Sequence, residues 1–285
     1  MKFLFPFTAA ASLLRALKLL KKNRIDAVLG TGGYSSFFAI LAAWILNKPA
    51  ALLDTNAIPG RSNRIASRFC RVAFTGLPGG ERGLRCPSHN TGTPVSASLE
   101  RHSTANARRE LGLDEDRPVV LFLGGSQGAR AVNDLALEMP GEITVLLQCG
   151  KTDLERVTAR GNSGNLIIEP FLNDLSLWYS AAELAVARAG GQTIAELSAF
   201  GLPAVLIPYP YAADDHQTAN AAVAERAGAA ILSSQGETTP SELSRLLLRL
   251  LSTPVELDGM RRAMGSLYPP DPAGQISRHL LELVS

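Results

Sequence analysis

The stretch Val119-Val-Leu-Phe-Leu-Gly-Gly-Ser-Gln-Gly128 joins five consecutive apolar residues to a turn that contains three glycines. An apolar run of this length predicts a strand that is buried on both faces. The apolar spacing after the turn, through Ala131 and Leu135, predicts a helix. A strand that leads through a tight turn into a helix is the repeating unit of parallel α/β sheets.

Short apolar runs of the same kind recur on both sides of this stretch. They lie at 26–29, 49–53 and 72–75 before it, and at 143–148, 165–168, 184–187 and 204–207 after it. Helical patterns lie between or after them, at 34–46, 63–69, 153–160, 193–199, 219–227 and 240–251. The region 76–117 is rich in Pro, Gly, Ser and Arg, so we expect it to connect the two series, with one helix near 106–111.

Two series of strands and helices predict an α/β protein with two Rossmann-like domains. We expect the first domain at residues 1–97 and the second at 98–265, with a C-terminal helix at 266–285 that packs back on the first. Ligands of open α/β sheets bind beyond the carboxyl ends of the strands. The expected site is therefore a cleft that the two domains face.

The composition excludes several classes of protein. Of 285 residues, 46% are apolar and 19% are charged, which is ordinary for a chain that buries a core. The net charge of +2 gives no reason to expect a nucleic-acid partner. Cys70, Cys86 and Cys149 are too few and too scattered for a disulfide frame, so we expect reduced thiols in a cytosolic protein. No run reaches the ~20 apolar residues of a membrane-spanning helix.

The first 22 residues are apolar and basic. Leucines recur at spacings of three and four, with Arg15, Lys18, Lys21 and Lys22 beside them, which predicts an amphipathic helix. A signal peptide is the less favoured interpretation, because no small-residue cleavage site follows. The pattern alone leaves two interpretations open: a helix on an anionic membrane surface, or a helix that packs on the core with a solvated basic side.

Two glycine-rich turns in the second half have the chemistry of a phosphate site. Glycines let the backbone approach a phosphate, and a helix N-terminus offers free N–H groups. The turn at 124–128 is one, although tight turns also need glycine for steric reasons. The other runs from Arg188 to Thr193, and Glu196 follows it, where a carboxylate can accept from ribose hydroxyls. The alternative for Thr193 and Glu196 is a capping box.

A polar cluster, Asp214-Asp-His-Gln217 with Asn220, opens another helix. Its donors and acceptors suit sugar hydroxyls, whereas two adjacent Asp and one His lack the spread of a metal site. The alternative is an Asp N-cap with a solvated first turn. In the first half, Gly30-Thr-Gly-Gly-Tyr34 is a further strand-to-helix turn, and Asn56 follows the next strand.

Taken together, these motifs resemble the MurG family of glycosyltransferases. The resemblance rests on their order and runs from about Pro6 to the C-terminus. It is carried by Gly30–Tyr34, Asn56–Gly60, Leu123–Arg130 with Asn133, Pro170-Phe171, Arg188–Gly190, Thr193, Glu196, Gly201–Pro203, Asp215–Gln217 and Asn220-Ala221.

The resemblance implies a GT-B fold and inverting transfer of N-acetylglucosamine from UDP-N-acetylglucosamine to undecaprenyl-pyrophosphoryl-N-acetylmuramoyl-pentapeptide. That reaction belongs to peptidoglycan synthesis, cell shape and cell division, at the cytoplasmic face of the membrane. Neither a cofactor nor an obligatory metal is implied. The implied donor site comprises Asn56, Ser126, Gln127, Leu172, Arg188, Gly190, Gly191, Gln192, Thr193, Glu196, Gln217 and Asn220. The implied membrane and acceptor side comprises Phe3, Phe5, Phe7, Arg15, Lys18, Gly32, Gly33 and Tyr34, so the family favours the membrane interpretation of the first helix.

The sequence also departs from the family pattern. A first Gly-Gly-Thr-Gly-Gly-His loop and its βα units are not present, so we expect an incomplete N-terminal domain, which a start further upstream or a separate chain would complete. Leu53-Asp54-Thr55 stands where the family has His-Glu-Gln, which leaves Asp54 as a weak candidate for the catalytic base. Ser96 replaces an arginine. Two alternatives therefore stay open: a paralogue that binds UDP-sugar without turnover, and a transferase acting on another lipid.

Overall fold

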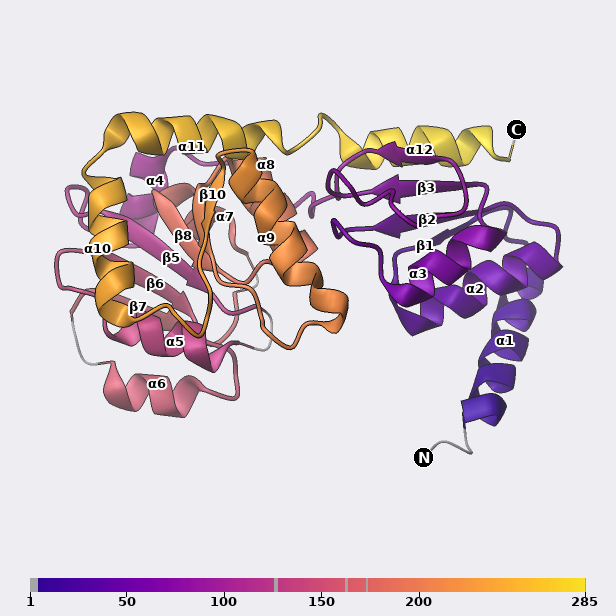
Figure 1. Ribbon diagram of the computed structural model, residues 1–285, viewed down its shortest axis with the longest axis horizontal. Helices are drawn as coiled ribbons and strands as arrows, with labels where there is room; N and C mark the ends of the chain where they lie inside the picture. Colours follow the sequence, from indigo (N-terminus) through magenta and orange to yellow (C-terminus); the bar gives the residue numbers. More distant parts are fainter. Residues whose placement is uncertain (1–4, 126–127, 162–163, 173, 285) are drawn as a thin grey trace. The chain divides into compact units, whose positions relative to one another are not determined.

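The computed structural model describes residues 5–125, 128–161, 164–172 and 174–284, with the side chains from Thr8 onward (Figure 1). The chain divides into two compact units. Unit 1 comprises the residues up to Pro94 together with those from Pro269, and unit 2 comprises Val95–Tyr268. Each unit holds one parallel sheet with its own helices. A two-domain α/β architecture is thereby confirmed.

Unit 1 contains a four-stranded parallel sheet in the order β1-β2-β3-β4 (Figure 1). Its strands are β1 Val28–Gly30, β2 Ala50–Asp54, β3 Val72–Thr75 and β4 Ser88–Asn90. Its helices are α1 Phe5–Lys22, α2 Gly33–Ile45, α3 Arg61–Ala66, the short 3-10 helix η1 Ser67–Phe69, and α12 Pro272–Glu282.

The strand β2 is buried on both faces, because helices cover both sides of the sheet. Leu52 packs with Ile40 of α2 in one apolar cluster. Leu53 packs with Ile276 of α12 in another. Successive side chains of a strand point to opposite faces, so α2 and α12 cover opposite sides of the sheet. The C-terminal helix thus completes the core of the unit that contains the N-terminal residues.

Unit 2 contains a six-stranded parallel sheet in the order β10-β9-β8-β5-β6-β7. Its strands are β5 Val119–Leu123, β6 Thr144–Gln148, β7 Leu166–Glu169, β8 Leu184–Ala187, β9 Ala204–Leu206 and β10 Ala230–Leu232. Its helices are α4 Thr104–Glu110, α5 Arg130–Leu137, α6 Leu154–Arg160, α7 Ser176–Ala181, α8 Gly191–Phe200, α9 His216–Arg226, α10 Pro240–Leu251 and α11 Pro254–Ser266, with the 3-10 helix η2 Ala213–Asp215 before α9.

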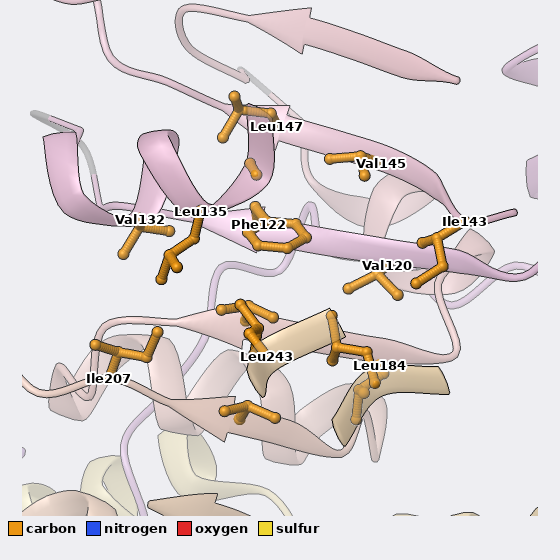
Figure 2. Close-up of a cluster of buried hydrophobic side chains, with 14 of the residues drawn as sticks. Val120, Phe122, Val132, Leu135, Ile143, Val145, Leu147, Leu184, Ile207 and Leu243 are labelled. Carbon is orange, nitrogen blue, oxygen red and sulfur yellow. The ribbon is translucent and has the colours of Figure 1, made fainter. Parts of the chain in front are cut away.

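The central strand of unit 2 is β5, which pairs with β6 on one side and with β8 on the other. Val120 and Phe122 of this strand pack against Val132 and Leu135 of α5 and against Leu243 of α10 (Figure 2). All five residues of β5 are buried, as the sequence predicted for a strand that is covered on both faces.

Several elements were missed by the sequence patterns. The strand β4 lies in the region expected to be a connection, and its polar Ser-His-Asn sequence gives no apolar signal. Among the described strands it pairs with β3 alone, at the edge of the sheet, so it need not be buried. The strand β10 and the helices α7 and α11 were also not predicted. Within the described ranges, no helix has both the length and the apolar character needed to cross a membrane.

The three cysteines are free thiols. Burial raises the pKa of Cys70 to about 12, and burial also raises the pKa values of Cys86 and Cys149. Thiols with raised pKa values stay protonated at neutral pH and are poor nucleophiles. They are therefore not candidates for covalent catalysis.

Candidate functional site

A hollow of about 600 Å³ lies at the carboxyl edge of the unit 2 sheet. The strand order runs outward from β5 through β6 in one direction and from β8 through β9 in the other, so the turns after β5 and β8 adjoin. This reversal is where open α/β sheets bind ligands. In the described part of the chain the hollow is lined by Gly124, Gly125, Gly128, Ala129, Arg130, Ala131, Arg188, Gly190, Thr193, Tyr209, Gln217 and Gln235.

The glycine turn after β5 forms one wall of the hollow. A side chain at Gly128 would place its Cβ 2.1 Å from the carbonyl oxygen of Cys149, so packing alone requires glycine there. Gly125 has a φ of +84°, yet its Cβ would meet nothing within 4 Å. The steric explanation therefore accounts for Gly128, whereas Gly125 leaves open space in front of the backbone. Ser126 and Gln127 lie outside the described residues.

The helix α8 forms the opposite wall and begins at Gly191. Its N-cap is Gly190, which has no side chain to accept from the first turn. The capping box considered for Thr193 and Glu196 is wrong, because Thr193 is the third residue of the helix and not its cap. The positive end of the helix dipole and its first N–H groups are thus left to a ligand or to water.

Arg188 is buried and lines the same hollow as the glycine turn and α8. Its Nη1 donates to the carbonyl oxygens of Ile207 and Pro208 at 3.0 Å each, and its Nη2 donates to Oε1 of Gln235 at 2.6 Å. The ring of Tyr209 lies 5.6 Å from its Cζ. Burial lowers the pKa of Arg188 below its ordinary value.

Arg188 carries a positive charge that the protein does not neutralise locally. Its side chain is 8% exposed, and within the described residues it forms no salt bridge. A buried charge without a partner is costly, so an anion in the hollow would relieve that cost. A phosphate group suits the fork of a guanidinium.

Two residues of the polar cluster have different roles: Gln217 lines the hollow, and Asn220 holds the turn after β8 in place. Oε1 of Gln217 accepts from the backbone N–H of Tyr209 at 2.9 Å, and Gln217 lines the hollow. Asn220 is fully buried and donates to the carbonyl oxygen of Ala189 at 3.0 Å. Asn220 therefore ties α9 to the turn after β8. Asp215 occupies the N-cap position but forms no capping hydrogen bond.

Glu196 lies one turn further along α8 and does not line the hollow. Its Oε2 accepts from the hydroxyl of Tyr179 at 2.8 Å, and its Oε1 accepts from Nε2 of Gln192 at 3.2 Å. Burial, together with the charge of Glu196, raises the pKa of Tyr179 well above its ordinary value, so the hydroxyl keeps its proton. Leu172 is half-buried on the loop after β7.

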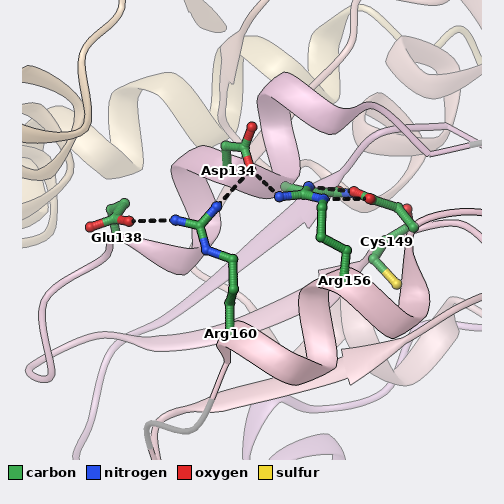
Figure 3. Close-up of polar contacts among 7 residues, drawn as sticks. Asp134, Glu138, Cys149, Arg156 and Arg160 are labelled. Atoms are coloured by element: carbon green, nitrogen blue, oxygen red, sulfur yellow. Dashed lines mark hydrogen bonds and ion pairs between the residues drawn. The ribbon is translucent and has the colours of Figure 1, made fainter.

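A polar network holds the helix that follows the glycine turn (Figure 3). Nδ2 of Asn133, on α5, donates to the carbonyl oxygen of Cys149 and to Asp153. Arg156 bridges Asp153 and Asp134. The hydrogen bonds from Arg156 lower the pKa of Asp153. These contacts fix α5 against the end of β6 and thereby fix the position of the glycine turn.

Asp54, the candidate base, is buried in unit 1 and organises the loop after β2. The residue is 2% exposed. Oδ1 accepts from the backbone N–H and the Nδ2 of Asn56, and Oδ2 accepts from the N–H of Gly60 and from Nδ2 of Asn63. Both oxygens are thus occupied by donors, which favours a structural role for Asp54. Asn56 is part of the same loop of unit 1.

The remaining candidates of unit 1 lie on α1 and on the turn before α2. Gly32 and Gly33 have positive φ values, as this turn requires, and Tyr34 is 53% exposed. Arg15 and Lys18 are exposed on α1, where Leu14 is also 67% exposed. Phe5 and Phe7 belong to the first turn of α1, and Phe3 lies outside the described residues.

The charge of the chain is divided unevenly between its two units. Unit 1 has 14 Lys and Arg against 5 Asp and Glu, a formal charge of +9, and unit 2 has 14 against 21, a formal charge of −7. The overall charge of +2 conceals this division. A strongly basic unit attracts anionic surfaces and ligands.

Sequence reasoning missed several residues of the site, among them Tyr209, Gln235 and Tyr179. Tyr209 and Gln235 line the hollow, and Tyr179 holds Glu196. Gln235 follows β10, and the rule that ligands bind beyond strand ends would have indicated it if that strand had been recognised. Tyr209 was visible within Pro208-Tyr-Pro210, but nothing in the sequence pairs it with Arg188. Tyr179 lies on a helix that the patterns did not reveal.

The chain is a glycosyltransferase of family 28. The profile of the glycosyltransferase family 28 C-terminal domain matches residues 119–267, and the profile of the N-terminal domain matches residues 1–75. More narrowly, the chain belongs to the MurG family, the UDP-N-acetylglucosamine–N-acetylmuramyl-(pentapeptide) pyrophosphoryl-undecaprenol N-acetylglucosamine transferases. The member from Solidesulfovibrio magneticus is 36% identical, over 91% of this chain and 74% of its own length. The member from Synechococcus elongatus is 36% identical, over 98% of this chain and 81% of its own length.

Solved structures agree with this assignment. The crystal structure of Acinetobacter baumannii MurG matches 97% of this chain and 79% of its own, with a TM-score of 0.75 and 29% identity. The UDP-GlcNAc 2-epimerase of Neisseria meningitidis, bound to UDP-GlcNAc, matches with a TM-score of 0.71 at 12% identity, which shows a shared fold only. The GT-B fold predicted from the resemblance is thus confirmed.

Proposed function

We propose that this protein transfers N-acetylglucosamine from UDP-N-acetylglucosamine to undecaprenyl-pyrophosphoryl-N-acetylmuramoyl-pentapeptide, in peptidoglycan synthesis. The relatives that carry this name are 34–37% identical over most of the chain. The observation that carries the proposal within this molecule is the buried guanidinium of Arg188 at the hollow, which is hydrogen-bonded to neutral acceptors and forms no salt bridge with a described residue.

In this proposal the hollow of unit 2 holds the donor. The diphosphate lies between the glycine turn after β5 and the N-terminus of α8, beside Arg188. Thr193 and Gln217 contact the diphosphate and the sugar inside the hollow. The ribose extends beyond the lining residues along α8, where Glu196 accepts from its hydroxyls. Ser126, Gln127, Gly190, Gly191, Gln192 and the backbone near Leu172 complete the donor site, and Asn220 supports it.

The chemistry requires stabilisation of the leaving UDP. As the glycosidic bond breaks, negative charge develops on the diphosphate, and a fixed guanidinium with a helix dipole stabilises that charge without rearrangement. A base removes the proton of the acceptor hydroxyl, which attacks the anomeric carbon with inversion. Because Arg188 and the backbone dipoles supply positive charge, we expect no requirement for a divalent cation. Among the residues described, no group of three or more His, Cys, Asp or Glu is placed to hold one.

We further propose that unit 1 faces the lipid-linked acceptor at the cytoplasmic surface of the membrane. Its formal charge of +9 and the exposed apolar and basic residues of α1 support this orientation. A separate chain that supplies further βα units belongs to the same proposal, since β1 pairs with only one strand in the described sheet.

The test is transfer of radiolabelled N-acetylglucosamine into a lipid-extractable product by the purified chain. We expect transfer that persists in EDTA and falls at least about tenfold in Arg188→Gln, because a charged hydrogen bond contributes ~1.5–3 kcal/mol. Transfer that is undiminished in Arg188→Gln would show that the hollow is not the donor site. Transfer that stops in EDTA and returns with Mg²⁺ would contradict the metal-independent mechanism.

A second candidate function is binding of UDP-sugar without turnover. The occupied carboxylate of Asp54 favours it, because a base needs a free oxygen within reach of the acceptor hydroxyl. Calorimetry with UDP-N-acetylglucosamine distinguishes the two candidates when it is combined with the transfer assay. Affinity without any transfer supports the binding function, and transfer that survives Asp54→Asn assigns the base to another group.

A further inference from the structure

Two of the three thiols of the chain lie on neighbouring segments of unit 1. Cys70 follows the 3-10 helix η1 and precedes β3, and Cys86 precedes β4. The strands β3 and β4 are adjacent and parallel, and Ala73 pairs in register with Ser88. The two thiols therefore stand side by side at the amino ends of these two strands.

Hydrogen bonds from both neighbours of Cys86 hold its backbone against the segment that contains the other thiol. The N–H of Arg85 donates to Oγ of Ser67 at 2.9 Å, and the carbonyl oxygen of Pro87 accepts from the N–H of Ala73 at 2.8 Å. Paired strands lie ~4.8 Å apart, and a disulfide spans Cα atoms that are ~4.4–6.8 Å apart. The backbone spacing is therefore that of a disulfide.

Both thiol side chains lie on the same face of the sheet. Cys70 and Cys86 each pack against the apolar cluster that contains Ala66 and Ala73, on the side that α2 covers. The thiol of Cys70 donates to the carbonyl oxygen of Ala66 at 3.4 Å, a weak bond that a disulfide would replace. Burial, with a smaller contribution from the nearby Cys86, raises the pKa of Cys70 to about 12. The two side chains can thus meet without a change of strand register.

A reagent can reach the pair from solvent. Cys70 lines a hollow of about 770 Å³ at the amino end of the unit 1 sheet, together with Trp44, Phe69 and Arg71 among others. Both thiols of the pair are partly exposed, whereas Cys149 of unit 2 is fully buried. A small reagent should therefore react with the pair before it reacts with Cys149.

We propose that Cys70 and Cys86 form a reversible dithiol–disulfide site that a small-molecule disulfide oxidises. The thiolate of one cysteine attacks the disulfide of the reagent, which forms a mixed disulfide and releases one half of the reagent as a thiol. The second cysteine, as a thiolate, then attacks the protein sulfur of the mixed disulfide and displaces the other half. The protein loses two hydrogens and two electrons, and the reagent gains them as two thiols.

The bond closes a ring that contains β3 and the loop 76–87. This loop packs against the loop after β2: the N–H of Gly76 donates to the carbonyl oxygen of Asp54 at 2.8 Å, and a Cβ at Gly80 would lie 2.7 Å from the carbonyl oxygen of Asn56. A disulfide stabilises a fold mainly by restricting the unfolded chain. Oxidation therefore stabilises unit 1 at the loop that Asp54 organises.

The experiment treats the full chain with oxidised glutathione at about pH 8.5, because burial raises the pKa values of both thiols and exchange is slow at neutral pH. Acid stops the exchange, N-ethylmaleimide blocks the remaining thiols, and peptide mass spectrometry identifies the linked cysteines. The variants are Cys70→Ser and Cys86→Ser, with Cys149→Ser as the matched control. Thermal melts verify folding, and wild type oxidised in urea shows the pairing of the unfolded chain.

We expect one disulfide per chain, between Cys70 and Cys86, while Cys149 stays reduced until urea unfolds the protein. Cys149→Ser should oxidise as fully as the wild type, whereas Cys70→Ser and Cys86→Ser should stop at a mixed disulfide with glutathione. Oxidation should raise the urea midpoint of the wild type by about 1 M, and dithiothreitol should reverse the change.

The wild-type protein decides the proposal even if a serine variant does not fold. Three outcomes would each overturn it. Both thiols could stay reduced at an excess of oxidant that pairs them in urea, the wild type could stop at a mixed disulfide, or the bond could involve Cys149 or a second chain.

Discussion

The hydroxyl of Tyr179 on α7 donates to Oε2 of Glu196 on α8 at 2.8 Å, and Tyr179 is 2% exposed. The bond fixes a carboxylate one turn beyond the N-terminus of α8. A carboxylate held in one rotamer loses less entropy when it accepts from a ligand. Glu196 is therefore preorganised to accept hydrogen bonds on its remaining lone pairs.

Replacing Glu196 by Ala should weaken the affinity for UDP-N-acetylglucosamine about 10–150-fold, as expected for the loss of a charged hydrogen bond. Tyr179→Phe should weaken it by less, about two- to tenfold, because the carboxylate stays but is no longer fixed. Calorimetry measures both affinities. Glu155→Ala is the matched control, since Glu155 is an exposed carboxylate in the first turn of a different helix, α6. Unchanged affinity in a folded Glu196→Ala would leave Glu196 with a structural role only.

Gln235 should control the charge of the donor hollow through Arg188. Its Oε1 accepts from Arg188 Nη2 at 2.6 Å. Gln235→Glu places a carboxylate there, which neutralises the guanidinium and should lower the affinity for UDP about tenfold or more. Gln235→Ala leaves the positive charge of Arg188 without a carboxylate beside it and should lower the affinity for UDP less than Gln235→Glu does. The ordering of the two variants in UDP titrations is the measurement, and a Glu variant that binds as well as the Ala variant would contradict it.

The pair of Asp153 and Arg156 should make the stability of unit 2 depend on pH. The folded state lowers the pKa of Asp153, chiefly through the hydrogen bonds from Arg156. A lowered pKa contributes stability that is present above the unfolded pKa of ~3.9 and is lost as the pH falls through the folded value. At pH 7, Asp153→Asn should lower the free energy of unfolding by about 1–3 kcal/mol.

Urea unfolding of wild type and Asp153→Asn at pH 7 and near pH 3 tests this dependence. The difference between the two proteins should shrink at the lower pH, because the unfolded wild-type chain then binds a proton at Asp153, which favours unfolding. Glu138→Gln is a suitable control, since its bond to Arg160 is exposed and surface ion pairs contribute little. A difference that is constant from pH 7 to pH 3 would show that the charge of Asp153 does not matter.

Vesicles containing anionic lipid should retain the protein, and the retention should weaken as salt increases. Each Lys or Arg near an anionic surface contributes ~1 kcal/mol, so Arg15→Gln/Lys18→Gln should weaken the binding. Leu14→Ser tests the apolar part of α1, because Leu14 is 67% exposed and its loss costs the fold little. Flotation at 50 and 300 mM salt, with neutral vesicles as the control, is the measurement. Equal retention on neutral and anionic vesicles would mean that electrostatic attraction between α1 and anionic lipid does not contribute to binding.

The sequence by itself determined the fold class and the local chemistry of the site. Apolar runs such as Val119–Leu123 indicate strands buried on both faces, and the glycines after them indicate turns with positive φ or close packing. These signals are local, because the period of a strand or helix and the steric freedom of glycine are properties of a few adjacent residues. The motifs around Arg188 and Gln217 could therefore be found without a structure.

Tertiary structure alone decided which of those residues act together. The polar edge strand Ser88–Asn90 forms because β3 offers it a hydrogen-bonding partner, and no local apolar signal marks it. Gln235 reaches Arg188 across 47 positions of sequence, and Tyr179 reaches Glu196 between two helices. The carboxylate of Asp54 accepts four hydrogen bonds from residues of its loop, and these bonds can be seen only in the folded structure. Such contacts depend on strand order and burial, which are set by the packing of the whole unit and not by neighbouring residues.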